Sequence, residues 1–285
     1  MKLTDISTIK DLFERHGFAF TKSLGQNFLI NPNICPKIAE LGGAAENVCA
    51  IEIGTGVGVL TRELSKRCKK VVAVEIDRKL EPILRETLNG CDNTEVIFAD
   101  VLKTDLGEII REKFGGAETI ICANLPFYIT SPVIMKVLES RLPITSMTVM
   151  VQREAAERIC AAVGTRESGA VSYAVSYYSD PRMLFKVNRG NFIPAPNVDS
   201  AVIRLDIKKS SPLCENEEKI LFRLIRAGFS KRRKQLVNPL SEELHISKAN
   251  AAALLDSIGV KPSSRAEELT LDDFIRLARS VKSSG

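Results

Sequence analysis

Residues 48–58 read VCAIEIGTGVG, a short apolar run that ends in three glycines spaced two apart, and they indicate the class of fold. An apolar run of this length before glycines is typical of a buried strand, and the apolar spacing that follows predicts a helix over 58–67. Glycines at such a junction let a bound molecule approach the backbone closely, because no side chain stands in the way. Val59 stands where the dinucleotide fingerprint G-x-G-x-x-G requires its third glycine, which argues against a dehydrogenase.

The alternation of strand and helix patterns continues beyond this stretch. Short runs rich in β-branched residues alternate with longer segments in which apolar residues recur every three or four positions, which is typical of a parallel sheet covered by helices. Five such β-α units in succession favour a doubly wound sheet. The predicted strands are 48–53, 70–76, 94–99, 119–123 and 146–152, and the predicted helices are 58–67, 79–88, 106–114, 132–140 and 153–162.

The pattern changes after residue 168. A helix is predicted over 168–178, and two strands, 182–187 and 200–208, are joined by the loop GNFIPAPNVDS, which is similar to an antiparallel hairpin at a sheet edge. After the linker Ser210-Ser211-Pro212 only helical periodicity remains. We therefore predict an α/β domain over 1–209, with an N-terminal extension over 1–45, and a small all-helical domain over 210–285. The helices of this second domain are predicted over 217–229, 232–240, 248–258 and 271–281.

The composition is that of an ordinary globular protein. Of 285 residues, 45% are hydrophobic and 26% are charged, which excludes disordered and collagen-like chains. Seven cysteines without a C-x-x-C pair indicate reduced thiols and a cytoplasmic location, and the charges near the N-terminus argue against a signal peptide or a membrane span. The two histidines, His16 and His245, offer too little for a metal site or a Ser-His-Asp triad, so we expect no metal.

Two carboxylates stand near the expected binding edge. Glu75 and Asp100 each lie at the carboxyl end of a predicted strand, on the side of the sheet where open α/β folds bind ligands. Each alone is better explained as a helix N-cap or a solvated loop residue. Together behind a glycine loop, they favour a nucleoside site in which Glu75 accepts from ribose hydroxyls and Asp100 from an adenine amino group. Because no lysine is placed to grip a phosphate, the expected cofactor is S-adenosylmethionine.

The stretch 123–130, ANLPFYIT, follows the fourth predicted strand. An exocyclic aromatic amine becomes a better nucleophile if the Asn124 side-chain oxygen and the Leu125 carbonyl accept its two hydrogens. Pro126 stiffens this corner by fixing its own φ, and Phe127 offers a face on which a base stacks. Taken singly, these residues fit an ordinary turn and a core aromatic. Their order, after a glycine loop, favours methyl transfer to a nucleobase by positioning.

Several further motifs accompany these: TKSLGQNFL, VEID, NFIPAPNVDSA, AGFSKRRKQLVNPL and RAEELTLDDFIRLA. Together with EIGTGVG, the Ala99-Asp100 pair and NLPF, they strongly resemble the ribosomal RNA adenine dimethyltransferases of the KsgA type, from about Lys22 to the C-terminus. The resemblance implies a Rossmann-like class I methyltransferase fold. Thr55 stands where the family usually has proline, and Tyr128 where asparagine is common; neither departure removes a group that the mechanism uses.

The resemblance also implies a substrate and residue roles. The implied acceptors are two adjacent adenines in a hairpin near the 3′ end of small-subunit ribosomal RNA, in an immature small subunit, each receiving two methyls at N6. Phe192 is implied as a second aromatic that faces Phe127 across the inserted adenine. The residues implied to bind the cofactor are Asn27, Leu29, Gly54, Gly56, Glu75, Asp100 and Asn124.

An adenine reaches such a pocket only when it is unstacked, so the substrate is expected to be a loop or single strand. Basic side chains would position this RNA by contacting its phosphates. For any single one of them, a solvated helix face explains the charge equally well. The candidate phosphate contacts are Lys22, Arg223, Arg226, Lys231, Arg232, Arg233 and Lys234.

Two other functions stay open at this point. One is the activity of the related family that methylates one adenine of large-subunit RNA and gives antibiotic resistance, although the segment KRRKQLVNPL speaks against it. Alternatively, the chain acts mainly as a ribosome-assembly factor in which methyl transfer is secondary. We expect a monomer that binds no membrane.

Overall fold

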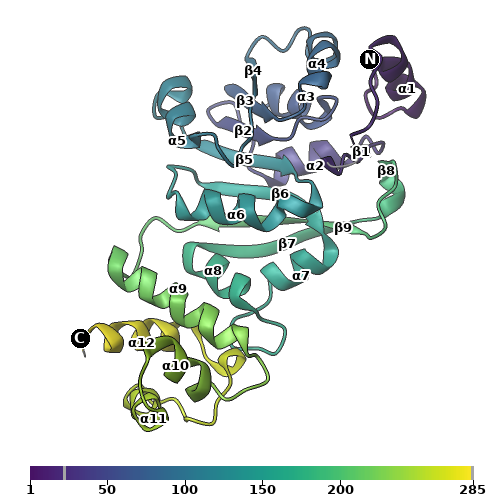
Figure 1. Cartoon of the computed structure of the whole chain (residues 1–285). Helices are drawn as coiled ribbons and strands as arrows, with labels where there is room; N and C mark the ends of the chain where they lie inside the picture. Colours follow the sequence, from purple (N-terminus) through teal and green to yellow (C-terminus); the bar gives the residue numbers. More distant parts are fainter. Residues whose placement is uncertain (22–23, 284–285) are drawn as a thin grey trace. The chain divides into compact units, whose positions relative to one another are not determined.

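The computed structural model describes residues 1–21 and 24–283, and the chain forms two compact units (Figure 1). The first unit consists of Met1–Ala156 and Pro181–Ile207. The second consists of Glu157–Asp180 together with the chain from Lys208 onward. Of the helices in the described part of the chain, none is both long and apolar enough to cross a bilayer.

A seven-stranded sheet lies at the centre of the first unit, in the order β4-β3-β2-β5-β6-β9-β7 (Figure 1). The first five of these strands are parallel, and β9 runs antiparallel to β6, with β7 beyond it at the edge. The predicted parallel sheet with an antiparallel edge is thus confirmed. The bounds are β2 Cys49–Ile53, β3 Lys70–Glu75, β4 Thr94–Phe98, β5 Thr119–Asn124, β6 Ser146–Gln152, β7 Ser179–Val187 and β9 Ser200–Ile207.

The strand order determines where a ligand can bind. From β2 the chain proceeds outward through β3 to β4, then returns to the other side of β2 and proceeds outward through β5 and β6. The order therefore reverses between β2 and β5, and open α/β sheets bind their ligands outside the carboxyl ends of the strands at this switch point. The glycine loop follows β2 and the NLPF stretch begins at the end of β5, so both are brought to this place.

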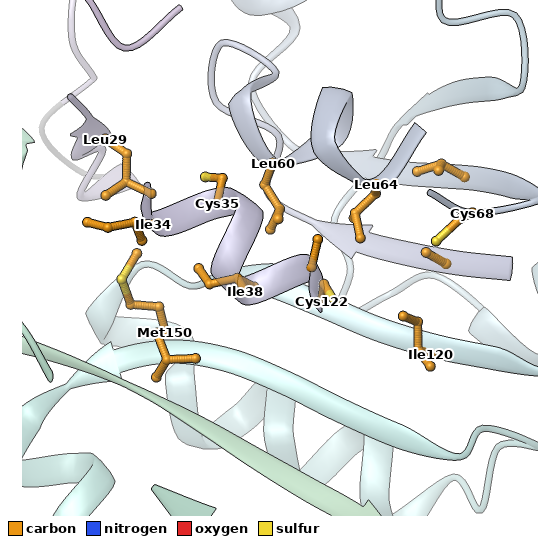
Figure 2. Close-up of a cluster of buried hydrophobic side chains, with 14 of the residues drawn as sticks. Leu29, Ile34, Cys35, Ile38, Leu60, Leu64, Cys68, Ile120, Cys122 and Met150 are labelled. Carbon is orange, nitrogen blue, oxygen red and sulfur yellow. The ribbon is translucent and has the colours of Figure 1, made fainter. Parts of the chain in front are cut away.

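The core explains why the central strands are apolar on both faces. All of β2 and nearly all of β3 and β5 are buried, as expected where helices cover both faces of a parallel sheet. Figure 2 shows side chains of α2 and α3 directed at the sheet, with Ile38 near Cys122 of β5 and Met150 of β6 reaching toward Ile34. The helices of this unit are α1 Ile6–Arg15, α2 Ile34–Leu41, α3 Val59–Ser65, α4 Glu81–Thr87, α5 Leu106–Ile109 and α6 Thr130–Glu139, and α7 Arg153–Ile159 begins in it and ends in the second unit.

A second, two-stranded sheet was not predicted from the sequence. Strand β1, Phe28–Leu29, pairs antiparallel with β8, Phe192–Ile193, and opposes Leu29 to Phe192. Strands of two residues carry no periodicity, so no sequence pattern reveals them. The pairing holds the N-terminal GQNFL stretch against the NFIPAP loop, which is far away in the sequence.

The second unit is all-helical in its C-terminal part, as predicted. Its helices are α8 Ala170–Tyr178, α9 Glu215–Ser230, α10 Val237–Leu244, α11 Lys248–Ser257 and α12 Leu271–Ser283. Two differences from the expectation concern its borders. The chain enters this unit for the last time at Lys208, close to the expected border, but residues 157–180, expected in the α/β domain, also belong to it.

Helix α8 belongs to the second unit for a specific reason. Its Tyr173 ring packs against Phe229 and Phe274, with centroids 5.1 and 5.3 Å away, and the hydroxyls of Tyr177 and Tyr178 both donate to Glu218. The sequence of a helix in a β-α alternation does not indicate against which unit its aromatic side chains will pack.

The helix predicted over 232–240 begins later than expected. The described chain leaves α9 at Ser230, passes through turns at Lys231–Lys234 and enters α10 at Val237. Four consecutive cations have no apolar side chain to bury, whereas Leu236 is fully buried and fixes the start of the next helix. The basic run therefore lies on an exposed turn and not on a helix face.

We predict that Ile38→Ala lowers the free energy of unfolding of the first unit by about 2–5 kcal/mol, because the side chain is fully buried between α2 and the sheet. Urea unfolding followed by circular dichroism measures this. The matched control is Ile6→Ala, whose side chain is 39% exposed and whose loss should cost less than about 1 kcal/mol. Equal effects of the two substitutions would show that the cluster of Figure 2 does not stabilise this unit.

Candidate active site

A cavity of about 240 Å³ lies at the carboxyl ends of the strands around the switch point. The glycine loop, Glu75 and Asp100 form one part of its wall, and the corner after β5 forms another. Segment 24–29 and Phe192 complete it. The structure thus brings together every residue predicted to bind the cofactor or to catalyse: Asn27, Leu29, Gly54, Gly56, Glu75, Asp100, Asn124, Leu125, Pro126, Phe127 and Phe192.

Glu75 holds the glycine loop in place. Its Oε2 accepts from the backbone N–H and the hydroxyl of Thr55, both at 2.9 Å, and from the Gly56 N–H at 3.4 Å. Its Oε1 accepts from the Asp77 N–H at 2.8 Å. The carboxylate is only 5% exposed, so these donors replace the water it loses. Oε2 therefore accepts only from the glycine loop. Oε1 accepts one hydrogen bond and has a second lone pair that no donor of the described residues occupies.

The loop itself requires glycine. Gly54, Gly56 and Gly58 have φ values of +78°, +54° and +88°, a region that side chains disfavour. A Cβ on Gly54 would lie 3.8 Å from the Asn124 carbonyl oxygen, so the loop after β2 and the corner after β5 are in contact. The carboxylate of Glu75 and the glycine conformations therefore define one wall together.

Asp100 is half-buried and only partly engaged. Its Oδ1 accepts from the Leu102 N–H at 2.9 Å, while Oδ2 has no partner among the described residues. The loop after it is fixed by Lys136 of α6, whose Nζ donates to the carbonyls of Leu102 and Thr104 at 2.8 Å each. One carboxylate oxygen is thus free to accept a hydrogen bond at the cavity.

The corner after β5 presents acceptors. The Leu125 N–H donates to the Met150 carbonyl at 3.2 Å, which ties the corner to β6, and the Leu125 side chain is buried. Within the described part of the chain, neither the Asn124 side chain nor the Leu125 carbonyl has a hydrogen-bond partner. Pro126 has a φ of −56° and leads into a short 3₁₀ turn. The two predicted acceptors of an amine are therefore both uncommitted at the cavity wall.

The aromatic residues differ in exposure. Phe127 is half-buried, while Phe192 is 5% exposed and belongs to the core cluster, so only part of its ring can face the cavity. Tyr128 is 55% exposed at the cavity wall. A Cβ on Gly25 would lie 3.6 Å from the Tyr128 ring, so the N-terminal segment touches the corner. The sequence had singled out Tyr128 only as a departure from a family pattern.

Glu52 is a wall residue that the sequence analysis missed. It lies on β2 between two apolar residues, is 1% exposed, and its Oε2 has no hydrogen-bond partner in the described chain. Burial raises the pKa of Glu52 to about 8; the Thr61 hydroxyl opposes the rise and the Glu75 carboxylate adds to it. Thr61 lies outside hydrogen-bond geometry, so burial dominates and the carboxyl is mostly neutral at pH 7. The sequence signal that could have identified Glu52 is its place as the one charged residue within an otherwise apolar strand.

The predicted RNA contacts fall into two groups on the second unit. Three are paired with glutamates: Arg223 with Glu243 at 2.9 Å, Lys231 with Glu242 at 2.7 Å and Arg232 with Glu267 at 2.7 Å. Three others are exposed and have no ion pair with any described residue, namely Arg226, Arg233 and Lys234. Lys22 lies outside the described residues. Sequence alone could not separate the groups, because two of the glutamate partners lie 20 and 35 residues away.

Comparison with known proteins agrees with this geometry. The family model "Ribosomal RNA adenine dimethylase" matches residues 17–283. The chain is 44% identical to Ribosomal RNA small subunit methyltransferase A of Geobacillus thermodenitrificans, covering 97% of each chain, and 44% identical to the protein of that name from Alkaliphilus oremlandii, covering 95% of each.

Two solved structures are similar over most of the chain. A dimethyladenosine transferase from Plasmodium falciparum has a TM-score of 0.75 at 27% identity, covering 87% of this chain and 95% of that one. The 23S rRNA methyltransferase ErmE has a TM-score of 0.70 at 26% identity, covering 90% and 100%. Fold and cavity together define a Rossmann-like class I methyltransferase. More specifically, the chain belongs to the ribosomal RNA adenine dimethylase family.

Glu52 generates a prediction about pH. Its folded pKa of about 8 exceeds the ordinary value of 4.5, so folding retains a proton and this carboxyl lowers stability progressively as pH rises from about 4.5 to 8. Glu52→Gln removes that dependence. Its stabilisation relative to wild type, measured by urea unfolding, should grow by roughly 3 kcal/mol between pH 5 and pH 8. The exposed Glu40→Gln is the control, and parallel profiles for wild type and Glu52→Gln would contradict the prediction.

Proposed function

We propose that this chain methylates two adjacent adenines in the 3′-terminal hairpin of small-subunit ribosomal RNA to N6,N6-dimethyladenosine during ribosome assembly, with S-adenosylmethionine as methyl donor. The observation that carries the proposal is the identity of 44% over 97% of both chains with a protein named Ribosomal RNA small subunit methyltransferase A. The cavity suits methyl transfer to an amine, because its wall carries the carboxylates of Glu75 and Asp100 and two acceptors without partners in the described chain, the Asn124 side chain and the Leu125 carbonyl.

The residues at the cavity fit this cofactor. Asp100 Oδ2 has no partner in the described chain and can accept from an adenine amino group, and Glu75 Oε1 keeps a lone pair for a ribose hydroxyl. The glycine loop lets the backbone approach closely. Asn27 and Leu29 would contribute the N-terminal part of the cavity wall. When bound, S-adenosylmethionine supplies an electrophilic methyl group on a positively charged sulfur.

The corner after β5 would activate the acceptor amine. For the first methyl, the Asn124 side-chain oxygen and the Leu125 carbonyl would each accept one amine hydrogen; for the second, the one hydrogen that remains would donate to one of them. In both cases the nitrogen lone pair is withdrawn from the ring and is directed out of its plane. Stacking on Phe127, with Phe192 on the other side, would hold the base in this orientation, worth about 1–3 kcal/mol per base. As the bond from nitrogen to the methyl carbon forms, the bond from sulfur to that carbon would break and leave the neutral thioether, and the proton that the amine loses would pass to water. No strong base is required, because positioning and the acceptors raise the nucleophilicity of the amine.

We choose the small ribosomal subunit as the substrate because of the sequence identity to named relatives. The large-subunit enzyme ErmE shares the fold at 26% identity, whereas the small-subunit methyltransferases are 44% identical across nearly the whole chain. The fold is common to this chain and ErmE, so the fold alone does not decide between the two substrates. The more extensive similarity favours an immature small subunit in the cytoplasm as the substrate. The scheme requires neither a metal nor a second copy of the chain.

The structure refines which cations we propose for RNA binding. Arg226, Arg233 and Lys234 are exposed and unpaired with any described residue, so they can contact phosphates without first leaving a glutamate. Arg223, Lys231 and Arg232 must exchange a surface ion pair for a phosphate, although such pairs contribute only about 0–1 kcal/mol. We therefore assign the first group the larger share of binding.

Asn124→Ala should reduce methyl transfer by at least about 100-fold, because one of the two amine acceptors is removed, while affinity for undermethylated small subunits stays within about twofold. Mass mapping of modified nucleosides after incubation with labelled cofactor measures transfer, and a filter-binding assay measures affinity. Asn89→Ala, at an exposed position away from the cavity, should behave as wild type. Undiminished transfer by Asn124→Ala would remove the proposed activation of the amine; labelled adenines in large-subunit RNA only would overturn the choice of substrate.

The two groups of cations can be separated by salt dependence. Replacing Arg233 and Lys234 together by alanine should lower the slope of log K against log salt by roughly 0.7–0.9 for each phosphate that these side chains neutralise in the wild-type complex. Replacing the paired Arg223 and Lys231 in the same way should change the slope less, because Glu243 and Glu242 already neutralise them. A slope equal to that of wild type in the first variant would show that the exposed turn does not face RNA.

A further inference from the structure

A hydrogen bond joins the N-terminal segment to the loop after β3. The side-chain amide of Gln26 is half-buried, and its Nε2 donates to Asp77 Oδ2 at 2.8 Å. Its Oε1 accepts from the Thr21 N–H at 3.2 Å. Asp77 is 6% exposed, so this contact is largely shielded from water. Hydrogen bonds to a charged acceptor in such surroundings are the stronger ones.

The contact is directional at both ends. Asp77 Oδ1 already accepts from the Lys79 N–H at 3.1 Å, where it caps a 3₁₀ turn, so Oδ2 is the oxygen left for Gln26. The Gln26 amide cannot reverse without placing its NH₂ group against the Thr21 N–H. Asp77 must therefore accept and Gln26 must donate.

The same residues connect to the cofactor wall. The Asp77 N–H donates to Glu75 Oε1, and Glu75 Oε2 accepts from the glycine loop. On the other side, Gln26 directly precedes Asn27, which lines the cavity, as do Gln26 itself and Leu29. An unbroken series of hydrogen bonds thus leads from Thr21 through Gln26, Asp77 and Glu75 to the glycine loop.

The other contacts of the segment do not fix it at this point. Phe28 packs with Phe13, Phe18 and Phe20, with centroids 5.2–6.2 Å from its ring, and β1 pairs with β8. These contacts begin at residue 28, after Asn27, and the approach of Gly25 to the Tyr128 ring joins the segment to the corner after β5, not to the Glu75 side. The Asn27 side chain donates only to the Gly25 carbonyl within its own segment, at 2.9 Å. Among the hydrogen bonds of the described residues 24–27, the one from Gln26 to Asp77 is therefore the one that sets the distance between Asn27 and the Glu75 side of the cavity.

We propose that Gln26 is a positioning residue, which through Asp77 fixes the segment carrying Asn27 against the Glu75 side of the cavity and so sets the affinity for S-adenosylmethionine. The inference rests on the proposed function, because it assigns the donor to this cavity. Without the bond, the wall formed by Asn27 and Leu29 has to be ordered when the donor binds, which costs affinity.

Two isosteric substitutions test the direction of the bond. Gln26→Glu keeps the acceptor for Thr21 but sets a carboxylate against Asp77, and Asp77→Asn keeps the cap on Lys79 but presents an NH₂ group to Gln26. Each should weaken S-adenosylmethionine binding by roughly 10- to 100-fold in calorimetry. The double variant restores one donor and one acceptor in reverse order, and should return to within about threefold of wild type.

The affinities of these three variants distinguish a positioning role from a purely electrostatic effect. If the two side chains acted only through their charge on a cationic donor, Gln26→Glu would bind more tightly than wild type, Asp77→Asn more weakly, and the effects would add. Tighter or unchanged binding by Gln26→Glu, or a double variant as weak as the worse single one, overturns the proposal. Gln26→Met, which removes the bond without adding charge, provides the same test by about tenfold weaker binding if Gln26→Glu fails to fold.

The controls are Gln235→Glu and Asp92→Asn, the same chemical changes at exposed positions away from the cavity, which should bind as wild type. Thermal unfolding of each variant without donor shows whether a loss of affinity follows a loss of folding. If wild type itself fails to bind S-adenosylmethionine, the proposed function falls, and the positioning role with it. If wild type binds and Gln26→Glu binds equally well, only the positioning role is overturned.

Discussion

The buried carboxylate of Glu75 holds the parts of the site together. It lies at the end of β3 and accepts hydrogen bonds from the loop that follows the neighbouring strand β2, so one side chain joins two strand ends of the sheet. It also accepts from the Asp77 N–H, and the Asp77 carboxylate in turn accepts from the side-chain amide of Gln26 in the N-terminal segment. Removing this carboxylate would leave buried N–H groups without acceptors, so its removal affects the shape of the cavity as well as contact with a ligand.

Two carboxyl groups at the same cavity are treated differently by their surroundings. Glu75 is surrounded by donors from Thr55, Gly56 and Asp77, whereas Glu52 Oε2 has no hydrogen-bond partner in the described chain and its pKa is raised to about 8 by burial. Glu52 therefore adds little negative charge to the wall of the cavity at pH 7.

The proposed methyl transfer needs little from titratable side chains. The corner after β5 offers a side-chain amide and a backbone carbonyl, both without partners in the described chain, and it is held by a hydrogen bond to β6 and by the buried Leu125 side chain. Rigid acceptors on strand ends position a base more accurately than mobile loop residues would, which suits a reaction governed by alignment. In the second unit the basic residues are instead exposed, and glutamates already neutralise some of them.

The parallel sheet, the succession of strands and helices along the chain, and Glu75, Asp100 and the corner after β5 follow from the sequence, because buried strands, glycine loops and strand-end carboxylates are local patterns. Asn27, Leu29 and Phe192 were predicted only through the resemblance to a family. Features that depend on distant partners came from the three-dimensional fold. Folding paired β1 with β8, placed residues 157–180 in the second unit, and set Gln26 against Asp77, 51 positions away. It also left Glu52 Oε2 without a partner in the described chain and divided the cations into paired and unpaired groups. Burial and pairing are properties of neighbours in space, and a sequence pattern records only neighbours along the chain.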